Sequence, residues 1–302
     1  MAVFRIRKEI APWQALGFGV ACVAVVLGLW WFFTSGASNE ERLVSPLVLP
    51  SPGETFAKFP DLWFERALTR NLGASLRRVA LGFSLAALVG VPLGVLCGCF
   101  FGVNAFFAPL SLFGRNIPVA ALAPLTFLLF GIDETQKVAF IFIACVAFVI
   151  SDTSRAIQDV GGEYIDTAYT LGASRWRVIS RVLFPLALPS IFNSLRLLFG
   201  IAFGYIMLVE TVQLQGEAGG LGGIINTSQR RSEREPILLV LVIIPLVAFA
   251  IDRSLFWIQK ELFPYRYGGR GLLHRCAGIC LHRWEDALRI VWRPKKSNGG
   301  SQ

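Results

Sequence analysis

The sequence predicts an all-α integral membrane protein with about six transmembrane helices. Of its 302 residues, 54% are hydrophobic and only 16% are charged, and the mean hydropathy is +0.58. An ordinary soluble domain carries more charge than this, and a disordered chain carries far less apolar surface. From Val79 to Gly114 the chain has no charged residue over 36 positions, which is more than one bilayer crossing requires.

The net charge of +9 lies mostly behind the apolar runs. Ten of the 29 basic residues follow residue 252, against three acidic residues in the same stretch. This distribution indicates that the basic residues face the anionic cytoplasmic surface of a membrane rather than a nucleic acid. The six cysteines lie in apolar runs or in this tail, so we expect no disulfide framework.

Residues 1–40 are expected to form an N-terminal anchor helix with its apolar centre at Trp13–Phe33. The alternative is a cleaved signal peptide, because Ser35-Gly36-Ala37 resembles a cleavage site. The apolar centre spans about 20 residues, whereas a signal peptide uses about 7 to 15, so a retained anchor is favoured.

Residues 41–75 are expected to form an external connection, as part of a polar loop from Glu40 to Arg78, and residues 76–260 the membrane-embedded core. The charge-free run would be about 54 Å long as a single helix, so it must break. We place the turn at Gly102–Asn104. The core spans expected from the apolar runs are 79–101, an interrupted 106–130, a short 138–151, 182–212 and 236–251.

Residues 152–181 are predicted to be a cytoplasmic loop, and 261–302 a basic cytoplasmic tail. With four crossings before that loop and two after it, both termini lie in the cytoplasm. In the 163–185 stretch, Ile165, Ala168, Tyr169 and Gly172 repeat with helical spacing. We expect two short helices, with Gly172 permitting the turn and Ser174 capping the second. Such an element suits the groove of a partner protein, and the alternative is a helix on the membrane surface.

This loop resembles the cytoplasmic loop of binding-protein-dependent ABC importer permeases, the segment known for Glu-Ala-Ala followed by Gly. Asp166 and Thr167 depart from the family's Glu and Ala, which keeps the charge and adds a hydroxyl. The resemblance implies that contact with an ATPase is made by Asp166, Thr167, Ala168, Gly172, Ala173, Pro185 and Pro189.

Further segments resemble the nitrate, sulfonate and taurine branch of that family. They are Leu49–Pro52, Arg115–Pro118, Ala121–Leu125, Phe130–Ile132 and Gly220–Gly222, whereas Gln213–Gln215 and Gln229–Glu235 are not typical of the branch. The resemblance implies a type I permease fold in the bacterial inner membrane. It also implies a second copy of the permease as a homodimer and a periplasmic or lipid-anchored solute-binding protein.

ATP and Mg would be bound by separate ABC ATPase subunits, because this sequence has no phosphate-binding loop of the G-x-x-x-x-G-K-[ST] type. We expect no catalytic residue, no metal and no cofactor on this chain. The tail motif His274-Arg275-Cys276 to Cys280-Leu281-His282 suggests zinc, but in a helix its histidines turn away from its cysteines. The remainder of the tail predicts a helix on the inner leaflet or a weakly ordered segment.

Three ionisable residues, Arg115, Arg196 and Glu210, fall within apolar runs and are candidates for the translocation pathway. For Arg115, a tether across the broken helix is as well supported as contact with the solute. For Arg196, which lies nearer the cytoplasmic end, a side chain that reaches the membrane interface is favoured. For Glu210, gating or packing is favoured over direct binding. The two guanidinium groups suit a small anion such as nitrate, a sulfonate or a taurine-like compound. A secondary transporter or channel is the alternative function, and it would predict inverted repeats.

Overall fold

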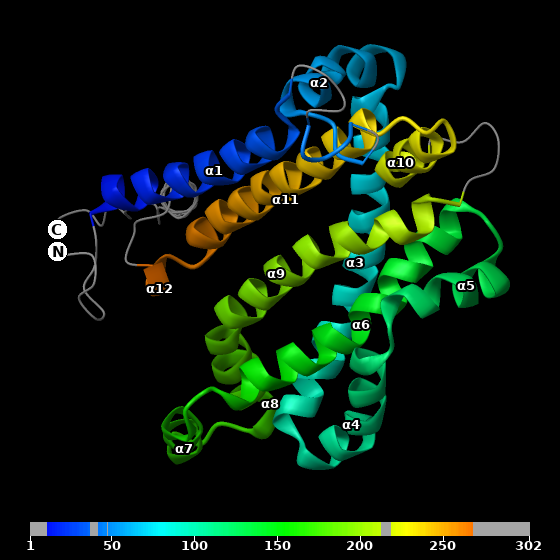
Figure 1. The fold of residues 1–302 in the computed structure, drawn as a ribbon. Helices are drawn as coiled ribbons and strands as arrows, with labels where there is room; N and C mark the ends of the chain where they lie inside the picture. Colours follow the sequence, from blue (N-terminus) through cyan, green and yellow to red (C-terminus); the bar gives the residue numbers. More distant parts are fainter. Residues whose placement is uncertain (1–10, 37–41, 47, 213–218, 268–302) are drawn as a thin grey trace, which may run out of the picture. The chain divides into compact units, whose positions relative to one another are not determined.

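The computed structural model describes residues 11–36, 42–46, 48–212 and 219–267, and every regular element in these ranges is a helix. The predictions for Gln213–Gln215, for the tail motif His274–His282 and for the remainder of the tail concern residues outside these ranges. The elements in chain order are α1 Pro12–Thr34, α2 Pro52–Ala57, η1 Asp61–Glu65, α3 Leu68–Cys99, α4 Phe101–Asn116, α5 Val119–Phe130, α6 Glu134–Gln158, α7 Gly162–Thr170, α8 Arg175–Val178, η2 Ile179–Leu183, α9 Phe184–Glu210, α10 Gly220–Arg230, α11 Glu235–Leu262 and α12 Pro264–Tyr267 (Figure 1).

The described chain has five helices long and apolar enough to cross a membrane: α1, α3, α6, α11 and the run Arg175–Glu210 that ends in α9. The pair α4 and α5 makes a sixth crossing if it is counted as one span, and it is bent by 102° at its break. Pro118 lies at that break and holds the preceding Ile117 in an extended conformation. The predicted all-α membrane fold with an interrupted third span is confirmed.

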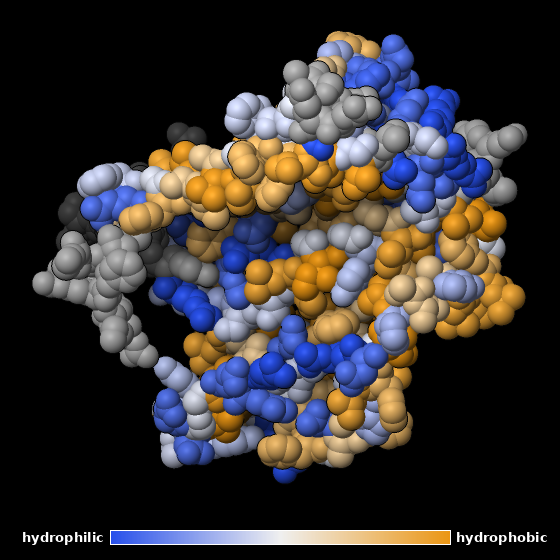
Figure 2. All heavy atoms as spheres, in the orientation of Figure 1, coloured by the Kyte–Doolittle hydropathy of each residue, from blue (hydrophilic) through white to orange (hydrophobic). Residues whose placement is uncertain are grey.

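Large apolar side chains remain exposed along these helices. Figure 2 shows hydrophobic surface along α11 and α5, where exposed residues include Leu246, Phe249, Leu128 and Leu129. Helices that are apolar on their outer faces suit a hydrocarbon environment.

Two predicted boundaries were wrong. The turn predicted at Gly102–Asn104 lies at Phe100, the extended residue that caps the start of α4. Gly102–Asn104 is part of that helix. The expected polar loop Glu40–Arg78 contains α2, η1 and the first turns of α3. Helix α2 has a capping box in which Ser51 and Glu54 satisfy each other's backbone N–H groups. A hydrogen bond from Arg42, with one from the Ser51 backbone, lowers the pKa of Glu54 to about 2.

The short predicted fourth span is part of α6, a 25-residue helix. Polar residues at both ends extend the 14-residue apolar run, so the helix is long enough to cross the bilayer. The domain boundaries at residues 40, 75 and 260 stay predictions.

The described chain divides into two compact units, and the long helices contribute to both. Unit 1 is Met1–Arg78, Ala123–Lys137 and Gly204–Leu246, and unit 2 is Val79–Leu122, Val138–Phe203 and Val247–Gln302. In unit 1, the Trp30 indole N–H of α1 donates to the Pro50 carbonyl at 2.9 Å, beside α2.

In unit 2, the backbones of α3 and α6 approach closely. Gly82, Gly90, Gly94 and Gly98 recur on one face of α3, and a Cβ at any of them would lie within 2.7 Å of an α6 atom. Small residues at such spacing let membrane helices pack at short range. This packing fixes α6, whose C-terminal end leads directly into the loop between α6 and α9.

Candidate coupling and translocation sites

Helices α7 and α8 form a short hairpin between α6 and α9, as the sequence predicted (Figure 1). Gly172 has a φ of +78°, a left-handed conformation in which other residues are strained. Its N–H donates to the Tyr169 carbonyl at 2.9 Å, and the Ala173 N–H donates to the Ala168 carbonyl at 3.0 Å. The predicted cap was wrong in one respect: Ser174 is at the N-cap position of α8, but its side chain makes no capping hydrogen bond.

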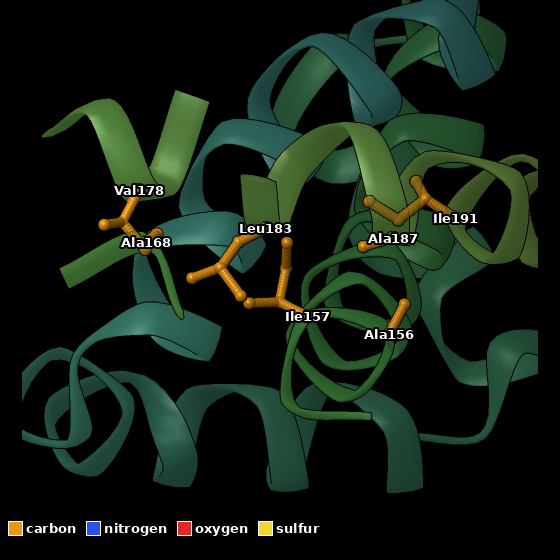
Figure 3. Packing of buried hydrophobic residues seen from close by; sticks show 7 residues of the cluster. All are labelled: Ala156, Ile157, Ala168, Val178, Leu183, Ala187 and Ile191. Atoms are coloured by element: carbon orange, nitrogen blue, oxygen red, sulfur yellow. The ribbon is translucent and has the colours of Figure 1, made fainter. Parts of the chain in front are cut away.

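A buried apolar cluster fastens the hairpin to the two helices on either side of it (Figure 3). Its members are Ala156 and Ile157 of α6, Ala168 of α7, Val178 of α8, Leu183 of η2, and Ala187 and Ile191 of α9. In Figure 3, Val178 lies against Ala168, while Leu183 and Ile157 point toward one another. The hairpin is therefore packed directly against the C-terminal end of α6 and the start of α9.

The opposite side of the hairpin is exposed. Leu171 is 82% exposed, Trp176 67%, Tyr164 51% and Tyr169 48%. Asp166 and Thr167 are exposed on the same short helix, and the Thr167 hydroxyl donates to the Glu163 carbonyl at 2.7 Å. Of the other residues expected to contact the ATPase, Ala168 and Pro189 are buried, Ala173 is half-buried, and Gly172 and Pro185 are exposed.

Arg115 lies in the last turn of α4, immediately before the break. Its guanidinium donates to the Ser151 hydroxyl at 2.6 Å and lies 5.4 Å from the centre of the Phe148 ring, both on α6. A cleft of about 860 Å³ surrounds it, lined by α4 and α6. The polar residues of this cleft are Asn104, Ser111, Arg115, Asn116, Ser151, Ser154, Arg155 and Gln158.

Arg196 is paired within unit 2. Its Nε lies 3.3 Å from the Asp252 carboxylate, its Nη2 donates to Asn193, and its guanidinium lies 4.7 Å from the centre of the Phe256 ring. Its side chain is 13% exposed. Arg196 thus contacts Asp252 and Phe256 of α11.

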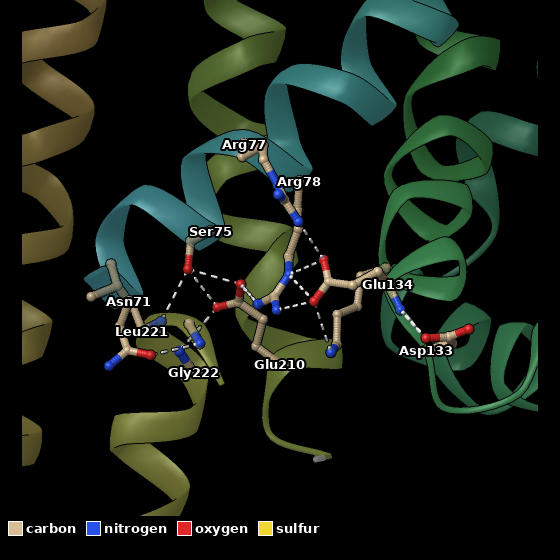
Figure 4. Close-up of polar contacts among 11 residues, drawn as sticks. Asn71, Ser75, Arg77, Arg78, Asp133, Glu134, Glu210, Leu221 and Gly222 are labelled. Atoms are coloured by element: carbon tan, nitrogen blue, oxygen red, sulfur yellow. Dashed lines mark hydrogen bonds and ion pairs between the residues drawn. The ribbon is translucent and has the colours of Figure 1, made fainter. Parts of the chain in front are cut away.

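Glu210 is the centre of a buried polar cluster in unit 1 (Figure 4). Its carboxylate accepts hydrogen bonds from the Ser75 hydroxyl at 2.7 Å, from Arg78 Nη1 at 2.8 Å and from the Gly222 N–H at 3.1 Å. Ser75 also accepts from the Leu221 N–H at 3.0 Å, and Asn71 accepts from the Gly220 N–H at 3.1 Å.

The first three N–H groups of α10 are therefore capped by side chains of α3 and α9. A carboxylate at this helix N-terminus also interacts favourably with the helix dipole. The glycines of α10 permit this approach, because a Cβ on Gly220 would overlap the Glu210 carboxylate and one on Gly222 would lie 2.7 Å from the Glu210 Cβ.

Sequence reasoning missed Arg78, which is 1% exposed and joins Glu210 to Glu134 of α6. Lys137, also fully buried, lies 3.6 Å from Glu134. The sequence placed Arg78 at the end of the polar loop Glu40–Arg78, and Lys137 falls in the connection between the predicted spans 106–130 and 138–151. One signal was available: Asn71, Ser75 and Arg78 have helical spacing and share one face of α3.

Comparison with known proteins identifies the family. Residues 90–263, more than half of the chain, match the family described as Binding-protein-dependent transport system inner membrane component. The taurine transport system permease protein TauC of Escherichia coli is 30% identical, covering 82% of this chain and 88% of that protein. The bicarbonate transport system permease protein CmpB of Synechococcus elongatus is also 30% identical, covering 79% of this chain and 87% of that protein.

Solved structures show the same fold. A chain of the inward-facing MetNI methionine ABC transporter superposes with a TM-score of 0.58 at 21% identity, covering 67% of this chain and 97% of that chain. A chain of an amino acid ABC transporter gives a TM-score of 0.56 at 18% identity, covering 68% and 97%. The chain therefore belongs to the binding-protein-dependent ABC importer permeases, as an inner membrane transport subunit with the type I importer fold and not an enzyme.

Proposed function

We propose that this chain and a second copy of itself form the translocation pathway of an ATP-driven importer for a small anionic solute. Separate ATPase subunits bind ATP and Mg and dock on the 163–185 loop. A periplasmic or lipid-anchored binding protein delivers the solute from outside. Six crossings put both termini in the cytoplasm of a bacterial cell.

The exposed face of the α7–α8 hairpin is the observation that carries the coupling role. Tyr164, Tyr169, Leu171 and Trp176 present exposed apolar surface on one side of the hairpin, while its other side is fixed by the buried cluster. An apolar helix face backed by a rigid cluster suits the groove of a partner protein. Because the cluster joins α6 and α9, movement of the partner would reach the transmembrane helices.

Leu171→Glu is expected to weaken ATPase binding about tenfold, the usual consequence of losing one well-buried interface side chain. Leu171 is 82% exposed, so the change leaves the internal packing of this chain intact. The measurement is the affinity of the purified ATPase subunit for the permease in lipid nanodiscs. Leu43→Glu is the matched control, since Leu43 is 69% exposed in the connection between α1 and α2. Equal affinity in the two variants would contradict docking at the hairpin.

The cleft around Arg115 supports an anionic solute. Arg115 presents a guanidinium beside hydroxyl and amide groups at the break of a membrane helix, a position where a charge is costly unless it has a polar role. The planar guanidinium fits the oxygen pairs of a sulfonate, carboxylate or nitrate. The relatives named for taurine and bicarbonate transport agree with this class of solute.

Helix α4 supports the second copy. None of its 16 residues is buried within the described chain, although its polar residues include Asn104, Ser111 and Asn116. Polar side chains at membrane depth face protein or a water-filled path rather than lipid. A second permease subunit would supply such surroundings on this side of the helix.

Arg115→Gln tests the anion pathway. If Arg115 contacts the solute, losing one charged hydrogen-bond donor should lower uptake about tenfold or more while the complex still assembles. The measurement is ATP-driven uptake of taurine, bicarbonate, nitrate and ethanesulfonate in proteoliposomes, with assembly checked by size exclusion. Ser151→Ala is the control, because it removes the partner of Arg115 and keeps the charge. Poor assembly of Arg115→Gln would indicate a tether, and normal uptake would exclude the anion role.

A further inference from the structure

The start of α9 contains two prolines, and they change its hydrogen bonding. Pro185 and Pro189 are four residues apart. Proline has no N–H, so Pro189 cannot make the helical hydrogen bond to the carbonyl four residues earlier, which is that of Pro185. The Pro185 carbonyl is therefore left without its helical donor and is free to accept a hydrogen bond from another segment.

The C-terminal end of α11 and the short α12 supply donors at this point. The Tyr265 hydroxyl donates to the Pro185 carbonyl at 3.1 Å, and Gln259 Nε2 donates to the Pro189 carbonyl at 3.2 Å. Gln259 is fully buried. The Tyr265 hydroxyl thus replaces the backbone donor that Pro189 lacks.

Two further contacts join the same segments. Arg266 Nη1 donates to the Ser190 hydroxyl at 2.8 Å. The Phe263 ring packs edge-on against Phe192, with 5.9 Å between the ring centres. The residues 259–266 therefore contact the stretch 185–192 through three hydrogen bonds and one aromatic pair, all within unit 2.

The other face of this stretch belongs to the cluster that fastens the hairpin. Leu183, Ala187 and Ile191 repeat every four residues and are buried against α6 and the hairpin. Pro185 and Pro189 are offset from them by two residues, which places them on the opposite side of a helix. The start of α9 is held between the hairpin on one side and the end of α11 on the other.

We propose that Tyr265 and Gln259 are positioning residues for coupling: they fix the start of α9 so that displacement of the hairpin moves α9 and α11 together. This inference rests on the proposed docking of ATPase subunits at the hairpin. Neither residue lines the cleft around Arg115. Both act through the proline carbonyls: the Tyr265 hydroxyl donates to Pro185, and the Gln259 amide donates to Pro189.

The test uses the full complex with its ATPase subunits in nanodiscs, followed by amide hydrogen exchange. Tyr265→Phe removes only a hydroxyl from a residue that is 65% exposed, so the fold should be kept. One hydrogen bond contributes enough to slow local opening about three- to tenfold, so exchange at residues 181–191 should speed up by that factor. Mg-ATP with vanadate should alter exchange in both the hairpin and α9 of the wild type, but only in the hairpin of Tyr265→Phe.

The double variant Tyr265→Phe with Pro189→Ala provides the decisive comparison. Alanine restores the N–H that can donate to the Pro185 carbonyl, so the double variant should recover both the slow exchange and the nucleotide response of α9. Tyr205→Phe is the control, since no hydrogen bond of its hydroxyl is found among the described residues of α9 and its neighbours.

Unchanged exchange at 181–191 in Tyr265→Phe would overturn the proposal. So would a double variant that behaves like the single one, because the hydroxyl would then act by some route other than the proline carbonyl. If nucleotide changes nothing in the wild-type hairpin, the docking proposal fails. The basal exchange of Tyr265→Phe still decides whether the end of α11 fixes the start of α9.

Discussion

Glu210→Ala is expected to lower the thermal stability of the purified protein by several degrees. It leaves the Gly222 N–H and the Ser75 hydroxyl without their acceptor, and it removes one of the two carboxylates that compensate buried Arg78. Removing one partner of a buried ion pair costs about 3–5 kcal/mol. In a chain of 302 residues, with an unfolding entropy of about 2.1 cal/mol/K per residue, that corresponds to a fall of about 5–8 °C in melting temperature. The measurement is thermal unfolding in detergent, followed by tryptophan fluorescence or size exclusion.

Two variants show whether the carboxylate charge or its hydrogen bonds matter. Glu210→Gln keeps an acceptor for Gly222 and Ser75 while it loses the charge, so its melting temperature should lie between those of wild type and Glu210→Ala. Glu163→Ala is the control, because Glu163 is an exposed carboxylate on α7. A melting temperature for Glu210→Ala within 2 °C of the wild type, inside the scatter of the control, would mean that the cluster contributes little to stability.

The predicted spans followed from hydrophobicity, because a bilayer requires long apolar helices whatever their packing partners are. The break before Val119 also followed from sequence, since Pro118 cannot continue the hydrogen bonding of α4. The turn at Phe100 did not follow from the sequence. The turn was predicted at Gly102–Asn104 because glycine and asparagine favour turns, whereas Phe100 carries no such signal.

Charge placement was the main failure of the sequence reasoning. Arg78 and Lys137 were placed in connections between spans because each lies at the edge of an apolar run. In the structure both are buried beside Glu134, and Arg78 also pairs with Glu210. Arg78 and Glu210 are 132 positions apart in the chain, so no local pattern could have joined them. The pairing of Arg196 with Asp252 was missed for the same reason.

The hairpin was the most predictable functional element, because its stripe, its turn glycine and its family resemblance are all local features. The sequence did not predict how the start of α9, which follows the hairpin, is held by the end of α11 and by α12. Tyr265 and Gln259 lie about 70 to 80 positions after the prolines that they contact. Tertiary hydrogen bonds of this kind leave no periodic signal in a single sequence.

Gly172→Pro is expected to abolish transport while the protein still folds into the membrane. Proline fixes φ near −65°, whereas Gly172 has a φ of +78°, and it removes the N–H that donates to the Tyr169 carbonyl. The turn between α7 and α8 must therefore rearrange, and the exposed residues on its two sides lose their relative positions. The transmembrane helices are not involved in this turn, so the melting temperature should change little. The measurement is uptake in proteoliposomes together with ATPase binding.

Gly162→Pro is the matched control for this variant. Gly162 is the first residue of α7, a Cβ there meets no atom within 4 Å, and proline is well tolerated at that position of a helix. The preceding Gly161 already has the extended conformation that proline requires of its neighbour, with φ −57° and ψ 138°. The same substitution ten residues apart in one hairpin thus separates the effect of the turn from the effect of proline itself. Normal uptake in Gly172→Pro, or equal loss in both variants, would contradict a role for the turn in transmitting ATPase movement.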